Sequence, residues 1–334
     1  MAIETSDWID FFPSTPEGVR PLQEKAINFI LNRFLEGAKK ILFEGPTGTG
    51  KSFVAYLVAL YFAIEHGKST RFLVPNRFLE DQYVADFGSL GIKQLHSARH
   101  YRCPSFGTCD IGRGSEIVSP PLATSATDPA AASRTVVTTV KSAIKCRHQA
   151  VCPYLKARTE FQTAPIGVTN TAYALTRARF RHDFVKSDLV VFDEAHNLGN
   201  QICSMFEIEI KFRLVDVTPA IGDEFAWLRD FYRPDIARLL EAELAQLEAT
   251  PSPAEIPELT KEIARLSGIL ANIDTVLADD PRDWVVIRSA DSIKFQPVWA
   301  TKSAPALLAF LSAHRLLMSA TFLDQTVHLQ TLGL

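Results

Sequence analysis

Eight consecutive residues, Gly45-Pro46-Thr47-Gly48-Thr49-Gly50-Lys51-Ser52, match the spacing G-x-x-x-x-G-K-S/T. Glycines at these positions let the backbone turn tightly and aim its N–H groups at phosphate oxygens. We expect Lys51 to pair with the β- and γ-phosphates of a nucleoside triphosphate and Ser52 to bind Mg²⁺. An apolar strand is expected at 40–45 and a helix at 51–65, whose positive end adds to the anion site. This segment therefore predicts a site for ATP with Mg²⁺.

A second segment, Asp193-Glu194-Ala195-His196, follows the apolar stretch 188–192, which reads as a buried strand. Ligands of open α/β sheets gather at the carboxyl ends of strands, where these residues would lie. Asp193 there can hold Mg²⁺ through water, and Glu194 can orient and deprotonate an attacking water. His196 is a candidate relay between nucleotide and nucleic acid. Such a segment alone can be a helix cap, but together with the phosphate loop it favours hydrolysis of ATP. The candidate catalytic residues are thus Lys51, Asp193, Glu194 and His196.

Four of the five cysteines form two pairs with equal spacing: Cys103 with Cys109, and Cys146 with Cys152. The fifth, Cys203, lies in an apolar stretch and is expected to be a buried thiol. In a reducing compartment grouped cysteines favour a metal site over disulfides.

The metal itself stays open at this point. The spacing is not the C-x₂-C of common zinc ribbons, and four thiolates suit a 4Fe–4S cluster. Zinc or unligated thiols are the alternatives, and the nearby His96, His100 and His148 keep zinc open as a metal for this site.

Composition and net charge restrict which partners the chain can bind. The 334 residues suggest two or three domains, the hydrophobic fraction of 47% is ordinary for a globular protein, and the net charge is −3. Nucleic-acid binding would therefore depend on local basic patches, such as Arg71 with Arg77, residues 134–158 or residues 177–182. Each patch is equally well explained as a solvated face. The N-terminus lacks a secretory pattern, and the longest apolar run, 53–64, is too short to span a bilayer. We expect an intracellular protein, cytoplasmic or nuclear, with no membrane partner.

Five further segments occur in a recognisable order: 20–23 (Arg-Pro-Leu-Gln), 99–104, 152–154, 168–173 and 317–321. With the two segments above, they make the chain similar over nearly its whole length to the iron–sulfur superfamily 2 DNA helicases, the XPD/DinG-like family. The resemblance implies that Arg20 and Gln23 serve the adenine side of the site. It also implies that Ser319-Ala320-Thr321 couples hydrolysis to movement of DNA.

The same resemblance implies a 4Fe–4S cluster on Cys103, Cys109, Cys146 and Cys152, and ATP-driven translocation on single-stranded or forked DNA, 5′ to 3′, of the kind used in DNA repair. Tyr101, Phe106 and Tyr154 are candidates to contact DNA, and packing around the cluster explains them equally well.

The expected fold class is α/β. A RecA-like parallel sheet with a phosphate loop (1–95, 165–203 and 297–334) would be interrupted by an iron–sulfur insertion (96–164) and a helical arch insertion (204–296). Alternation of strands and helices (40–45, 51–65, 70–75, 77–87, 166–169) supports the sheet. Two apolar stripes, 236–247 and 259–277, predict a helical hairpin, for which a plain spacer is the alternative. Strands at 284–287 and 293–298 are expected to return to the lobe, and 314–319 to be its last strand.

The family has a second RecA-like lobe with arginines that reach the γ-phosphate, and no such motif is visible before Leu334. An arginine of this kind contributes on the order of 10³–10⁵ in rate. The expectation is that a second lobe or a protein partner supplies it, and that this chain alone hydrolyses ATP poorly and unwinds nothing. A non-unwinding, ATP-dependent DNA-binding switch and a repair scaffold remain as alternatives.

Overall fold

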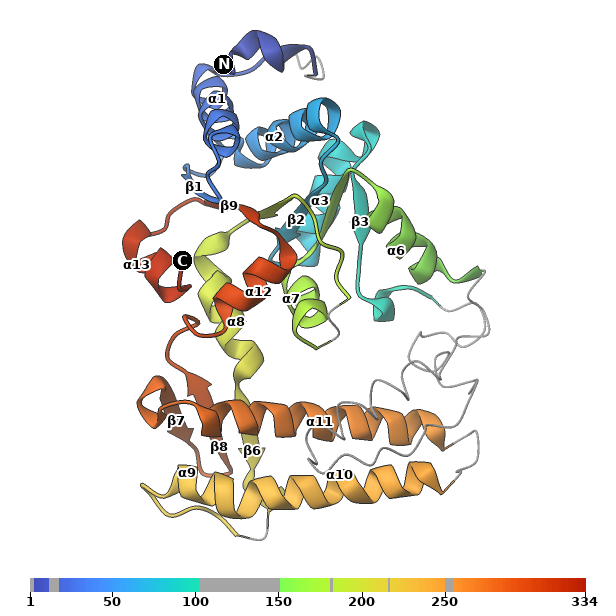
Figure 1. Cartoon of the computed structure of the whole chain (residues 1–334), viewed down its shortest axis with the longest axis vertical. Coiled ribbons are helices and arrows are strands. Elements are labelled where there is room, and N and C mark those ends of the chain that lie inside the picture. Colours follow the sequence, from blue (N-terminus) through green and yellow to red (C-terminus); the bar gives the residue numbers. More distant parts are fainter. Residues whose placement is uncertain (1–2, 12–17, 103–150, 181–182, 216, 250–254) are drawn as a thin grey trace. The chain divides into compact units, whose positions relative to one another are not determined.

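The computed structural model describes residues 3–11, 18–102, 151–180, 183–215, 217–249 and 255–334 (Figure 1). Contacts divide the chain into two compact units. The lobe unit comprises Met1–Ser97, Tyr154–Ile202 and Trp299–Leu334, and the insert unit comprises Ala98–Pro153 and Cys203–Val298. Within the described ranges, no helix combines the length and the apolarity needed to cross a bilayer.

A six-stranded, all-parallel sheet forms the centre of the lobe unit, with the strand order β1-β9-β5-β2-β4-β3. Both faces of such a sheet are covered by helices, so its central strands are buried: every residue of β2 and β5 is buried, and β5 is wholly apolar. The strands are β1 (Lys40–Glu44), β2 (Thr70–Val74), β3 (Lys93–Leu95), β4 (Ile166–Asn170), β5 (Leu189–Phe192) and β9 (His314–Ser319).

The helices linked to this sheet follow the pattern of crossover connections between parallel strands. They are α1 (Pro21–Leu35), α2 (Lys51–His66), α3 (Arg77–Phe87), α6 (Pro153–Thr163), α7 (Thr171–Phe180), α8 (Leu198–Phe206), α12 (Ala304–Leu311) and α13 (Gln325–Thr331). The α/β class and the parallel sheet predicted from sequence are confirmed, as is the placement of 314–319 as a strand of that sheet.

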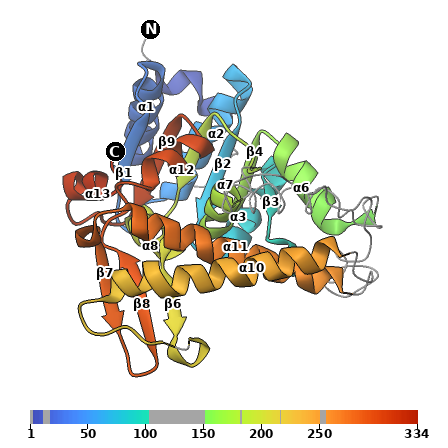
Figure 2. The same cartoon turned by 60° about the horizontal axis from the view of Figure 1, so that its bottom comes forward.

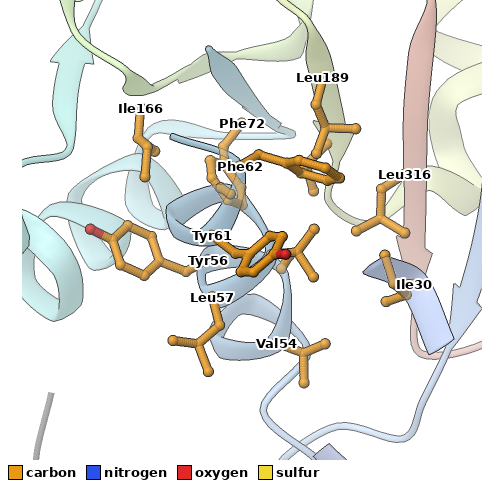
Figure 3. Close-up of a cluster of buried hydrophobic side chains, with 14 of the residues drawn as sticks. Ile30, Val54, Tyr56, Leu57, Tyr61, Phe62, Phe72, Ile166, Leu189 and Leu316 are labelled. Carbon is orange, nitrogen blue, oxygen red and sulfur yellow. The ribbon is translucent and has the colours of Figure 1, made fainter. Parts of the chain in front are cut away.

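Helix α2 lies within the largest cluster of buried apolar side chains (Figure 3). It is apolar around most of its circumference, which is typical of a helix with neighbours on several sides. Figure 3 shows Tyr56 and Leu57 of this helix together with Phe72 of β2 and Leu316 of β9. The helix that begins at the phosphate loop is therefore anchored in the core along its length.

The insert unit contains two long antiparallel helices and a small sheet (Figure 2). The long helices are α10 (Arg233–Glu248) and α11 (Ile256–Ala278), preceded by α9 (Glu224–Trp227) and a π-helical turn (Leu228–Tyr232). The predicted apolar stripes are buried between them, for example Leu240 on α10 and Ile263 on α11. Leu239, which we assigned to the same stripe, is instead half exposed. The helical hairpin is thus present, with a narrower apolar face on α10 than expected.

The expectation that residues 284–287 and 293–298 return to the lobe sheet is wrong. They form β7 (Trp284–Arg288) and β8 (Ser292–Pro297), which pair antiparallel with each other and with β6 (Ile208–Lys211) in a separate sheet of order β6-β8-β7. Antiparallel strands need only a short turn, whereas a parallel strand needs a crossover. The turn between β7 and β8 is closed by hydrogen bonds between Ser289 and Ser292, so the local pairing is favoured.

Short 3-10 turns complete the description: Thr5–Asp7, Ile9–Phe11, Gly88–Leu90, Ala98–His100, Ala195–Asn197, Phe212–Leu214 and Pro281–Asp283.

Candidate nucleotide site

The predicted phosphate loop connects the end of β1 to the start of α2. Gly48 has φ 84° and Gly50 has φ 79°, a left-handed conformation that favours glycine. Gly50 is the N-cap of α2, and a Cβ at this position would lie 2.3 Å from Nε2 of Gln23. Both the backbone conformation and the close approach of Gln23 therefore require glycine here.

Lys51, the first residue of α2, turns its ammonium group back into the loop. Its side chain is buried, and Nζ donates a hydrogen bond to the carbonyl oxygen of Gly45 at 2.8 Å. The loop thus combines a fixed cation with the positive end of a 16-residue helix, the arrangement that attracts phosphate.

Arg20 and Gln23, which we assigned to the adenine side, lie against the loop itself. Gln23 Nε2 donates to the carbonyl of Thr49 at 2.9 Å, and Arg20 Nη1 donates to that of Gly48 at 3.2 Å. The backbone N–H of Arg20 donates to Gln23 Oε1 at 3.1 Å, which holds the two residues together at the start of α1. The structure brings them to the nucleotide loop, and a contact with adenine remains a prediction.

Asp193 follows β5 and is buried beside the loop. Its Oδ2 accepts a hydrogen bond from the hydroxyl of Tyr83 at 3.0 Å, and its Oδ1 accepts one from the backbone N–H of Glu194 at 3.0 Å. Burial raises the pKa of this carboxyl above its ordinary value. Together with the Ser52 hydroxyl, it provides the hard oxygen donors that suit Mg²⁺, so the residues present fit the expected metal.

Glu194 occupies a strained backbone position, with φ 51° and ψ 44° in the left-handed region. A non-glycine residue there is energetically unfavourable, and such strain is concentrated at functional sites. In this conformation Glu194, like Asp193, lines the cleft next to the phosphate loop. Its Oε2 lies 3.2 Å from Nδ1 of His196.

His196 connects this segment to the Ser319-Ala320-Thr321 segment. Its Nδ1 lies 2.8 Å from Oγ of Ser319, and its Nε2 lies 2.8 Å from Nδ2 of Asn197. Because Ser319 Oγ donates its proton to the carbonyl of Thr321 at 2.8 Å, it must accept from His196, which assigns the histidine proton to Nδ1. The carbonyl of Ser319 in turn accepts from the N–H of Gly45 at 3.1 Å. One set of hydrogen bonds therefore joins both motifs to the phosphate loop.

A cleft of about 620 Å³ opens between the loop and α3, a size typical of ligand pockets. It is lined by the loop (Thr47, Lys51, Ser52), by Gln82 of α3 and by both acidic residues, Asp193 and Glu194.

Sequence reasoning missed two residues of this site. Tyr83 was assigned no role, and Asn197, the partner of His196, was not considered. Spacing of Tyr83 and Phe87 four residues apart indicates only the buried face of a helix. The partner of Tyr83, Asp193, is 110 residues away in the chain, so no local pattern could have paired them.

Of the four clustered cysteines, only Cys152 lies within the described residues, directly before α6, where it is half-buried. Cys103, Cys109 and Cys146, like His148 and Phe106, lie outside them. In the part of the chain that the structure describes, no group of three or more His, Cys, Asp or Glu side chains is placed to hold a metal. Cys203 is buried on α8 as expected, and burial raises the pKa of its thiol.

Several residues proposed from sequence to contact nucleic acid are structural instead. Arg71 is 1% exposed and donates to the backbone carbonyls of Gln162 and Pro165 at the end of α6. Arg177 is also buried and pairs with Asp183. Tyr154 is buried and shares a hydrogen bond with the hydroxyl of Tyr173 at 2.9 Å, which supports packing over contact with DNA.

The chain is similar to proteins of known family and of known structure. Residues 17–219 match the ResIII family, described as type III restriction enzyme, res subunit. Among solved structures, the chain is similar to an XPD helicase at 16% identity and a TM-score of 0.53, covering 94% of this chain and 60% of that one. A truncated XPD matches at 16% identity and a TM-score of 0.49, covering 94% and 97% of the two chains. A search of curated proteins gives no significant match.

This chain thus spans about three fifths of the XPD helicase that it matches. It belongs to the ResIII family, the type III restriction enzyme res-subunit family of superfamily 2, and its fold is XPD-like.

Proposed function

We propose that this chain is the ATP-hydrolysing motor core of a DNA helicase of the iron–sulfur type. The observation that carries the proposal is the continuous hydrogen-bonded set from Gly45 of the phosphate loop through Ser319 to His196, with Asp193 and Glu194 beside it. A nucleotide held in the loop would contact elements at the ends of β1, β5 and β9 together, which is the requirement for coupling hydrolysis to movement.

Each residue has a definable role in this proposal. The backbone of residues 45–50 and the ammonium of Lys51 bind the phosphates. Ser52 and Asp193 hold Mg²⁺, which when bound neutralises charge on the phosphates. Glu194 accepts the proton of the attacking water. His196, which is hydrogen-bonded to Ser319, couples the nucleotide site to the residues that bind DNA.

Single-stranded or forked DNA is the proposed substrate, with movement 5′ to 3′. In the described residues, Arg77 and Phe78 at the start of α3 support a DNA contact, because both are more than half exposed. An exposed guanidinium suits contact with the phosphate backbone, and an exposed aromatic ring suits base stacking.

We further propose that Cys103, Cys109, Cys146 and Cys152 bind a 4Fe–4S cluster in the insertion 96–164, and that residues 204–296 form the arch beside the DNA path. Iron and sulfide analysis of chain purified without oxygen tests this: about four of each per chain, lost in Cys152→Ser, is expected. Zinc alone would favour a zinc-stabilised insertion instead. We propose an intracellular location, cytoplasmic or nuclear, and a role in DNA repair.

A second RecA-like lobe or a protein partner is proposed to complete the site. The greater length of the matched XPD helicase supports this, since this chain spans 60% of it. An added arginine from such a lobe would raise hydrolysis by about 10³–10⁵.

Substitution Glu194→Gln tests the motor function. It keeps the size of the side chain and one accepting oxygen but removes the base. We expect turnover of ATP, measured with the second lobe or partner present, to fall about 10²–10⁴-fold, while ATP-dependent binding of a fluorescent single strand persists. If Glu194→Gln leaves ATP turnover unchanged, the proposed role of Glu194 is wrong. If the wild-type chain binds DNA when ATP is bound but does not unwind a duplex with any partner, the alternative of a non-unwinding switch or repair scaffold is favoured.

A further inference from the structure

Tyr83 is a tyrosine at a position where the surrounding residues would accept a phenylalanine. It lies on α3 with 2% of its surface exposed, and its ring centroid is 5.2 Å from that of Phe72 and 5.7 Å from that of Phe87. Apolar packing accounts for the ring but not for the hydroxyl, which must be hydrogen-bonded to be buried at all.

The hydroxyl contacts an oxygen donor of the site. It lies 3.0 Å from Oδ2 of Asp193. A carboxylate can only accept and a phenol carries one proton, so Tyr83 donates that proton to Asp193. The buried hydroxyl is therefore satisfied by the carboxylate that is expected to hold Mg²⁺.

We propose that Tyr83 is a positioning residue, which sets the carboxylate of Asp193 for binding of a Mg²⁺–nucleotide complex. The inference rests on the proposed function of the site. Asp193 is held at both oxygens, at Oδ1 by the N–H of Glu194 and at Oδ2 by Tyr83. Its carboxylate plane is thereby fixed, and the buried ring gives Tyr83 no room to move away.

The chain offers a matched control in Tyr56. It too is a fully buried tyrosine, and its ring stacks on Phe87 at 4.2 Å. Its hydroxyl, however, donates to the backbone carbonyl of Leu90 at 3.0 Å and to neither Ser52 nor Asp193. Removing either hydroxyl deletes one hydrogen bond from the same aromatic cluster, and only one of the two touches the site.

The experiment compares Tyr83→Phe and Tyr56→Phe in the full chain. Binding of a fluorescent ADP is titrated at several Mg²⁺ concentrations and in excess EDTA. For Tyr83→Phe we expect affinity in Mg²⁺ to fall about tenfold, the loss of a hydrogen bond to a charged group, and affinity in EDTA to stay within about twofold. Tyr56→Phe should match wild type under both conditions.

Three outcomes overturn the inference. Unchanged Mg²⁺ dependence in Tyr83→Phe is the first, and an equal loss in Mg²⁺ and EDTA, which indicates general distortion, is the second. The third comes from a double-mutant cycle: in the Asp193→Ala background, Tyr83→Phe should have no further effect on affinity in Mg²⁺, and a full additional loss would contradict the proposed route. If wild-type chain binds no nucleotide, the proposed function fails as well; if wild type binds with Mg²⁺ dependence, the function stands whatever Tyr83 does.

Discussion

The lobe unit buries several charged side chains, whereas the described part of the insert unit keeps its charged side chains at the surface. Among the described residues, the lobe unit buries six acidic or basic side chains, namely Lys51, Arg71, Glu80, Arg177, Asp193 and His328. In the described part of the insert unit the buried side chains are apolar apart from Ser292, and ion pairs such as Lys261–Glu258 lie at the surface.

This difference distinguishes burial that stabilises the fold from burial that serves the nucleotide site. Burying charge is unfavourable unless partners compensate, so an element that serves only packing avoids it. The insert unit follows that rule through the facing apolar stripes of α10 and α11. The lobe unit departs from it at the phosphate loop and at Asp193, where a desolvated setting makes electrostatic contacts with a ligand stronger. It departs from it also at Arg71 and Arg177, whose charges are compensated by backbone carbonyls and by Asp183.

Among the variants that compare the two units, we expect the largest effect from removal of the positive charge of Lys51 in the phosphate loop. Lys51→Ala should lower ATP turnover by about 10²–10³-fold, because a preorganised positive group no longer faces the phosphates. Steady-state phosphate release measures this. The matched control is Lys261→Ala on α11, whose exposed partner is Glu258. Equal turnover in both variants would show that Lys51 has a structural role. The contrast between the buried charges of the lobe unit and the surface charges of the insert unit would then have no bearing on chemistry.

Next in size is the core of the insert unit. Ile273 is fully buried on α11, and Ile273→Ala should lower the free energy of unfolding by about 2–5 kcal/mol. Denaturant unfolding measures this, and affinity for fluorescent ADP should not change. Leu239→Ala, on the half-exposed face of α10, serves as the control and should stay within about 0.5 kcal/mol. A parallel loss of nucleotide affinity in Ile273→Ala would mean that packing and chemistry are not separate.

A buried arginine in the lobe unit tests whether basic residues there serve structure or DNA. Arg71→Met leaves the carbonyls of Thr70, Gln162 and Pro165 without their donor and should destabilise the chain by about 1–3 kcal/mol. Burial already lowers the pKa of Arg71 to about 10, which reflects the unfavourable surroundings of the charge. Thermal unfolding is the measurement. Arg77→Met, at an exposed position, should leave stability alone; weaker DNA binding by Arg71→Met at unchanged stability would reverse our assignment.

The smallest effect concerns pH. Burial, and then the neighbouring His196, lower the pKa of His328 below its ordinary value of 6.5. The folded chain therefore resists a proton that the unfolded chain accepts, so stability is complete above about pH 6.5 and declines as the pH falls below it. His328→Leu should remove up to about 1 kcal/mol of this decline between pH 6.5 and 5. Thermal scans across that range measure it, with exposed His66→Gln as the control; an unchanged slope in His328→Leu would refute the assignment.

Local patterns predicted a large part of the fold. Helices α2 and α3 and strands β1, β2 and β4 lie within one residue of the expected bounds, because apolar periodicity and the glycines of the loop act over short distances. The pairing of β7 with β8 was missed, since an alternating strand does not reveal its partner. Burial of Arg71 was also missed, because two of its three partner carbonyls, those of Gln162 and Pro165, are more than 90 residues away in the chain.

By itself the sequence determined which residues can do chemistry: the order of glycines, Lys51 and Ser52 has few meanings other than a phosphate loop, and Asp193-Glu194 after an apolar strand places two carboxylates at the end of a strand. Only the tertiary structure decided how they are joined. Strand β9, the last in the chain, lies between β1 and β5, which brings Ser319 to both His196 and Gly45. Tyr83 likewise reaches Asp193 only because α3 packs against the sheet. Hydrogen bonds depend on distance in space, and separation along the chain carries no information about them until the sheet has formed.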